Sequence, residues 1–127
     1  MGFMKRATWK KKIREACEDA GTYRPFFDMV IDTLAGILER RDLAVQEFEE
    51  SGCCVLITHV NQAGEANLTQ NPALRLINDL NRDALQYWRD LGLTPAGLRR
   101  INEERLTAVE KKRTENVLSI VQGRRRA

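Results

Sequence analysis

The sequence predicts a mainly α-helical protein: a long antiparallel helical hairpin with a short β-hairpin between its two long helices, assembled into oligomers. Apolar residues recur every three or four positions over residues 25–51 and again over 72–91, which is the period of a helix face. Between them, residues 53–60 have the apolar and β-branched content of a strand. The 127 residues suit one domain, placed at 1–122, followed by a basic tail at 123–127 that we expect to be disordered.

The composition permits nucleic-acid binding without requiring it. The chain has 21 basic and 18 acidic residues, a net charge of +3, and its basic residues gather at the two ends. No apolar run approaches the roughly 20 residues of a membrane span, so we expect no membrane partner and a cytoplasmic location. The three cysteines make a poor disulfide framework because Cys53 and Cys54 are neighbours, which favours reduced thiols.

The first helix is expected at residues 7–20. Thr8 is its candidate N-cap and Gly21 its candidate end. One face of this helix is apolar and is formed by Trp9, Ile13, Ala16 and Cys17.

Cations crowd the other faces of this helix and recur at the C-terminus. They form either solvated, solubilising surfaces or a patch that contacts nucleic-acid phosphates, as clustered Lys and Arg do. The candidate DNA-binding residues are Lys5, Arg6, Lys10, Lys11, Lys12, Arg14, Arg124, Arg125 and Arg126.

The second helix, at residues 25–51, has a seam with alternating steps of four and three residues, and Arg41 occupies one seam position. Further apolar residues widen this stripe, so the helix should be buried on more than one side. Gly36 lies inside the helix and indicates either close approach of another element or simple tolerance.

The predicted β-hairpin consists of residues 53–60, a turn at 61–65 and a short return strand at 66–69. A lone two-stranded hairpin is marginally stable in water. It therefore needs a partner surface, from its own helices or from a neighbouring subunit.

The third helix, at residues 72–91, has clear boundaries. Asn71 can cap it, Pro72 fits its first position, and Gly92 can take the left-handed conformation that closes it. Packed antiparallel on the second helix, it completes a helical hairpin over 25–91. The candidate core or oligomer residues of this hairpin are Phe27, Ile31, Leu34, Leu38, Ile77, Tyr87 and Trp88, the last two being core or subunit-interface residues.

The last helix is expected at residues 94–122 and starts at Thr94 and Pro95. Its charges are mixed and its apolar stripe is thin and broken, which is typical of an exposed helix. We therefore expect it to be stable only when packed on other chains.

The residues suggest no catalytic, cofactor or metal site. His59 is the only histidine, and no nucleophile–base pair can be assembled around it. The spacing of Cys17, Cys53 and His59 does not suit zinc, and a fourth ligand is missing. The sequence also lacks a glycine-rich phosphate loop and a carboxylate cluster suited to two metal ions.

Two blocks flank the third helix, Gln70-Asn71-Pro72-Ala73-Leu74 and Leu91-Gly92-Leu93-Thr94-Pro95, with Arg99 following. Together with the tryptophan-led basic helix, the long helix and the apolar strand, this order resembles the small subunit of a tailed-phage DNA-packaging terminase. The resemblance spans about Trp9 to Arg100, most of the chain. The chain departs from the family pattern at Ala96-Gly97, where small hydroxyl residues are usual. No helix-turn-helix is recognisable, which leaves the mode of DNA contact open.

The resemblance implies a non-catalytic adaptor of genome packaging. Such subunits form homo-oligomeric rings, bind viral double-stranded DNA near the packaging start, and regulate the large terminase subunit, which carries the ATPase and nuclease. It also implies a location in the host cytoplasm. Two other interpretations stay open: a small helical transcriptional regulator acting as a dimer on a palindromic operator, and a helical scaffold that does not bind nucleic acid.

Overall fold

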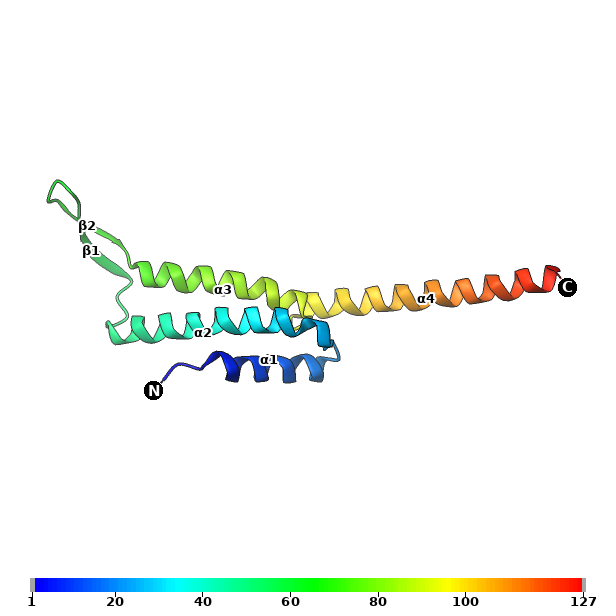
Figure 1. Cartoon of the computed structure of the whole chain (residues 1–127). Coiled ribbons are helices and arrows are strands. Elements are labelled where there is room, and N and C mark those ends of the chain that lie inside the picture. Colours follow the sequence, from blue (N-terminus) through cyan, green and yellow to red (C-terminus); the bar gives the residue numbers. More distant parts are fainter. Residues whose placement is uncertain (1, 127) are drawn as a thin grey trace.

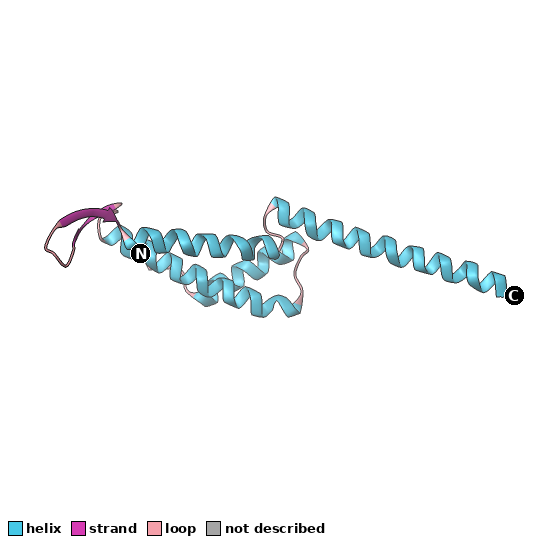
Figure 2. Ribbon diagram, turned by 90° about the horizontal axis from the view of Figure 1, so that it is seen from above, coloured by secondary structure: helices cyan, strands magenta, loops and turns pink. Residues whose placement is uncertain are grey.

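The computed structural model describes residues 2–126, with side chains over residues 2–123. The elements follow one another as helix α1 (Arg6–Ala20), a 3₁₀ turn η1 (Pro25–Phe27), helix α2 (Asp28–Glu50), strands β1 (Leu56–Val60) and β2 (Ala66–Gln70), and helices α3 (Pro72–Asp90) and α4 (Pro95–Arg126). Helix α2 packs against both α1 and α3, while the β-hairpin extends from one end of this bundle and α4 from the other (Figures 1 and 2). The predicted mainly helical fold with a β-hairpin between two long helices is confirmed.

The core lies along α2, between α1 and α3. Its fully buried side chains include Ile13 and Cys17 from α1 and Ile31, Leu34 and Leu38 from α2. Helix α3 contributes Ile77, Leu80 and Ala84, and Leu91 closes the end of the core next to α4. Phe27, Tyr87 and Trp88 are half-buried against this core.

The predicted ends of α3 are confirmed. The Asn71 side-chain Oδ1 accepts a hydrogen bond from the backbone N–H of Ala73 at 3.0 Å, as an N-cap does. The Asn71 Nδ2 donates to the carbonyl of Cys54 at 2.8 Å, so the cap also ties α3 to the segment that precedes β1. At the other end, Gly92 has φ 73° and the N–H of Leu93 donates to the carbonyl of Trp88 at 2.8 Å.

Two predicted starts are wrong. Helix α1 begins at Arg6, and its N-cap is Lys5 rather than Thr8. Strand β1 begins at Leu56 rather than Cys53, because Gly52 and Cys53 both have positive φ angles and turn the chain out of extended geometry.

The last helix also differs from its prediction. Helix α4 continues past the expected end at Gln122, so residues 123–126, expected in a disordered tail, are helical. Ala127 lies outside the described residues.

The β-hairpin is amphipathic and its apolar face is uncovered. Leu56 pairs with Gln70, Thr58 with Leu68 and Val60 with Ala66, which places these residues on one face of the two-stranded sheet. Leu56, Val60 and Leu68 are each more than half exposed. The helices of the same chain therefore do not supply the partner surface that the hairpin needs.

Helix α4 leaves the bundle almost at once. Every described side chain from Asn102 to Gly123 is exposed, including Leu106, Val109 and Ile120. Its start is fixed at Gly97, where an added Cβ would fall far inside van der Waals contact with the carbonyl oxygen of Arg89. Only glycine lets the first turn of α4 approach the end of α3 this closely.

Leu34→Ala is expected to lower the free energy of unfolding by about 2–5 kcal/mol, because Leu34 is fully buried in the core to which α1, α2 and α3 contribute, and truncation leaves a cavity. Urea denaturation measures the change. Leu85→Ala, at a side chain 40% exposed on α3, should cost clearly less. Equal losses of stability for the two variants would contradict this packing of α2.

Gly97→Ala is expected to destabilise the α3–α4 corner, because the added methyl group cannot be placed without moving Arg89 or α4. Gly123→Ala is the matched control: nothing lies within 4 Å of its Cβ position, and alanine favours a helix by up to about 1 kcal/mol. The midpoint of thermal unfolding should fall for Gly97→Ala and stay unchanged or rise for the control. A Gly97→Ala protein as stable as the wild type would show that the corner is not tightly packed.

Candidate nucleic-acid interface

The cations predicted to bind DNA near the N-terminus divide into two groups, and the first group holds α1 on α2. The Arg6 guanidinium donates two hydrogen bonds to Asp32, from Nε at 3.1 Å and from Nη2 at 2.6 Å. The backbone N–H of Arg6 donates to Glu39 at 2.6 Å. An added Cβ at Gly36 would lie 3.4 Å from the end of the Arg6 side chain, which is an ordinary van der Waals distance, so this position tolerates glycine without requiring it.

Arg14, just past the middle of α1, also has partners outside its own helix. Its guanidinium donates to the Tyr23 hydroxyl and to Asp28, and these partners raise the pKa of Arg14. Lys10 has its Nζ 4.0 Å from Asp32 Oδ1. Each of these cations has an acidic partner on α2. The nearby carboxylate offsets its positive charge, so it should attract a phosphate less strongly than an unpaired cation would.

Trp9 completes this contact between α1 and α2. Its indole N–H donates to Asp42 Oδ2 at 2.7 Å, and the Arg41 guanidinium lies 5.5 Å from its ring centroid. Arg41 itself pairs with Asp42 at 2.9 Å. The arginine that interrupts the apolar seam of α2 therefore supports the docking of α1.

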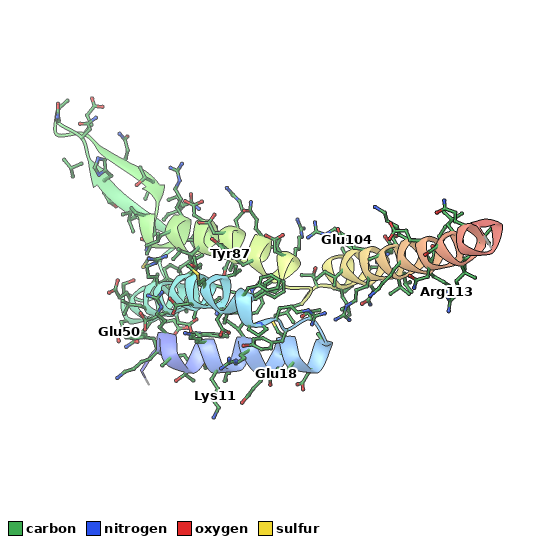
Figure 3. The ribbon with its side chains drawn as sticks, turned by 45° about the vertical axis from the view of Figure 1, so that its right-hand side comes forward. Lys11, Glu18, Glu50, Tyr87, Glu104 and Arg113 are labelled. Carbon is green, nitrogen blue, oxygen red and sulfur yellow. The ribbon has the colours of Figure 1, made fainter. Side chains whose placement is uncertain are left out.

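The second group consists of Lys5, Lys11 and Lys12, whose side chains are exposed. None of the three has a carboxylate within ion-pair distance in the described part of the chain. Figure 3 shows Lys11 pointing away from α2. Acidic residues follow within two turns along α1: Glu15, Glu18 and Asp19. The cationic surface of α1 is thus confined to its N-terminal half.

The remaining predicted DNA-binding residues are Arg124, Arg125 and Arg126. They belong to the last turn of α4, and their side chains lie outside the described part of the structure.

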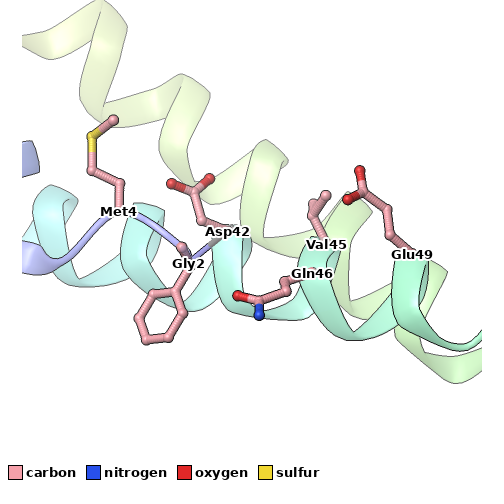
Figure 4. A pocket seen from close by; sticks show the side chains of 7 residues that line it. Gly2, Met4, Asp42, Val45, Gln46 and Glu49 are labelled. Carbon is pink, nitrogen blue, oxygen red and sulfur yellow. The ribbon is translucent and has the colours of Figure 1, made fainter.

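Residues 2–4 lie beside the second half of α2, and an open hollow of about 420 Å³ lies between them and the helix (Figure 4). Its lining residues are Gly2, Phe3, Met4, Asp42, Val45, Gln46 and Glu49. The lining contains two carboxylates and no cation, so the hollow does not suit a phosphate group.

Helix α3 carries exposed arginines that were not among the predicted DNA-binding residues: Arg75, Arg82 and Arg89. The signal that could have found them is their spacing of seven residues, which places them on one side of a helix. These arginines form a surface separate from that of α1.

The histidine and the cysteines do not form a cluster in the described part of the chain. His59 is exposed on β1, Cys17 is buried in the core, and Cys53 and Cys54 are exposed before β1. Burial raises the pKa of the Cys17 thiol, which keeps it protonated and unreactive. Within residues 2–126, no three His, Cys, Asp or Glu side chains are close enough together to hold a metal ion. No helix in this part of the chain has the length and apolar character to span a membrane.

The exposed cations of α1, the uncovered apolar face of the β-hairpin and the unsupported α4 are surfaces suited to contacts with other macromolecules. The family of phage terminase small subunits matches this chain over residues 6–106. The chain belongs to that family, as the resemblance indicated, and the family is non-catalytic. Membership implies a role in phage DNA packaging, with DNA and the large terminase subunit as partners. Among curated proteins and solved structures, no match was found.

A triple variant, Lys5→Gln with Lys11→Gln and Lys12→Gln, is expected to weaken binding to duplex DNA. Each phosphate contact removed should lower the magnitude of the slope of log binding constant against log salt concentration by about 0.9. Replacing three lysines should therefore lower this slope by about 3. Fluorescence anisotropy over a salt series measures it. In the control Lys10→Gln, the lysine lies next to Asp32, so its loss should lower the slope by less than the roughly 0.9 expected for one free lysine. An unchanged slope in the triple variant would remove the α1 lysines from the interface.

Proposed function

We propose that this chain is the ring-forming, non-catalytic adaptor that binds viral double-stranded DNA at the start of genome packaging and regulates the large terminase subunit in the host cytoplasm. Family membership supports the packaging role. The observation that carries the ring is the apolar surface that one copy leaves uncovered.

That surface lies at both ends of the bundle. On the β-hairpin, Leu68 is 72% exposed, and on α4, Leu106 is 64% exposed. A helix in a protein gains most of its stability from packing its apolar stripe against other elements. Beyond its first turns, α4 has no such packing within one copy of the chain. Leu106, Val109, Val117 and Ile120 fall on one side of α4 and are all more than half exposed. Copies of the chain that pack side by side would cover these surfaces.

A ring would also strengthen a weak grip on DNA. One copy has a net charge of only +3, and several of its cations are paired with acidic residues of α2. A ring repeats each exposed cation around its circumference. Such multivalency raises apparent affinity by about 10²–10⁴ without any new contact.

Native mass spectrometry combined with DNA binding tests this proposal. A ring-sized oligomer that binds duplex DNA with a steep salt dependence is the expected result. A dimer that protects a short palindrome would contradict it in favour of a transcriptional regulator. The same oligomer without salt-dependent DNA binding would contradict it in favour of a scaffold.

A further inference from the structure

A stripe along the outer side of α3 is composed of arginine and amide side chains, with Asp79 and Leu85 at its edges. Residues three, four, four and three positions apart fall on this side, and all are exposed. We call them the α3 ridge: Arg75, Asn78, Arg82, Gln86 and Arg89.

The α3 ridge faces away from the core. The buried residues of α3 are Ile77, Leu80 and Ala84, and at about 3.6 residues per turn the ridge lies on the opposite side of the helix. Helix α3 lies on the far side of α2 from α1, so α1 does not cover the ridge (Figure 1). From Arg75 to Arg89 the ridge extends about 21 Å, with successive arginines about 10 Å apart.

The ridge arginines differ from those of α1 because they hold no other helix in place. Arg75 and Arg89 have no carboxylate within ion-pair distance among the described residues. Arg82 lies 3.9 Å from Asp79, and this pair is loose because its side chains are 75% and 55% exposed. Arg6 and Arg14, by contrast, join α1 to acidic residues of α2.

The acidic residues of α3 do not interrupt the ridge. Asp83 and Asp90 lie about a quarter turn round the helix from the ridge, while Asp79 lies at its edge, next to Arg75 and Arg82. Asp90 lies 3.5 Å from Arg100 of α4.

The ridge continues towards α4. Arg89 and Arg100 line one hollow of about 170 Å³ with Ala96 and Gly97. The close contact of Gly97 with the Arg89 backbone makes this arrangement possible. Arg89 therefore lies beside the start of α4, where Arg100 is paired with Asp90.

We infer that the α3 ridge is a DNA-contacting surface, in which the arginines bind backbone phosphates of duplex DNA and Asn78 and Gln86 donate hydrogen bonds beside them. This inference rests on the proposed function and adds a surface to it. Arginine forks bind phosphate oxygens in pairs, and amides are common partners of DNA. A protein partner fits less well, because the ridge has no apolar or aromatic side chain to anchor the centre of an interface.

The test compares two double variants of the full chain, each replacing two exposed arginines that have no carboxylate partner among the described residues. The first is Arg75→Gln with Arg89→Gln, on the ridge. The control is Arg24→Gln with Arg40→Gln, off the ridge. Duplex affinity over a salt series is measured by fluorescence anisotropy, and the assembly of each variant by native mass spectrometry.

The ridge variant should lower the magnitude of the salt slope by about 2, as expected when two phosphate contacts are removed, with assembly unchanged and the control slope close to wild type. A ridge variant with the wild-type slope, or with the same reduction as the control, would overturn the inference while leaving the proposed function in place. Loss of assembly in the ridge variant alone would also overturn it, because the ridge would then join copies of the chain. A wild-type protein that does not bind duplex DNA would overturn the inference and the proposed function together.

Discussion

The structure depends on the burial of α2 between α1 and α3. Ile31, Leu34 and Leu38 on α2 are fully covered, and the two flanking helices contribute the rest of the core. Burial of such side chains is worth about 1.5–3 kcal/mol each relative to exposure. No equivalent burial exists for the described side chains of the β-hairpin or of most of α4. One copy of the chain thus has a stable centre and two ends that need partners.

The same packing decides which charges are available to a ligand. Helix α2 directs Asp28 and Asp32 towards α1, where they bind Arg14 and Arg6. Some of the cations of α1 therefore form ion pairs that join α1 to α2. Helix α3 meets α2 through apolar side chains and leaves its arginines on the outside. Arg75 and Arg89 of α3 are therefore as free of acidic partners, among the described residues, as Lys5, Lys11 and Lys12 of the N-terminal region.

Local chemistry predicted much of the fold. The Asn71 cap and the Gly92 end could be placed because each depends on a few adjacent residues. The start of β1 could not, because the left-handed conformation of Cys53 is unusual for a residue with a side chain. The internal role of Arg6 was also out of reach, since Asp32 is 26 positions away in the sequence. The periodicity of the α3 ridge was visible, but its exposure was clear only after α3 had been placed on α2.

If other copies of the chain cover the β-hairpin and α4, both elements should depend on assembly for their protection from solvent. Hydrogen exchange measured by mass spectrometry, at concentrations above and below assembly, tests this dependence most directly. We expect amides of residues 56–70 and 102–123 to be protected in the assembled protein and to exchange rapidly after dilution, while those of α2 stay protected in both. Equal protection of α4 before and after dissociation, or rapid exchange of α4 within the assembly, would contradict the claim that other copies of the chain cover α4.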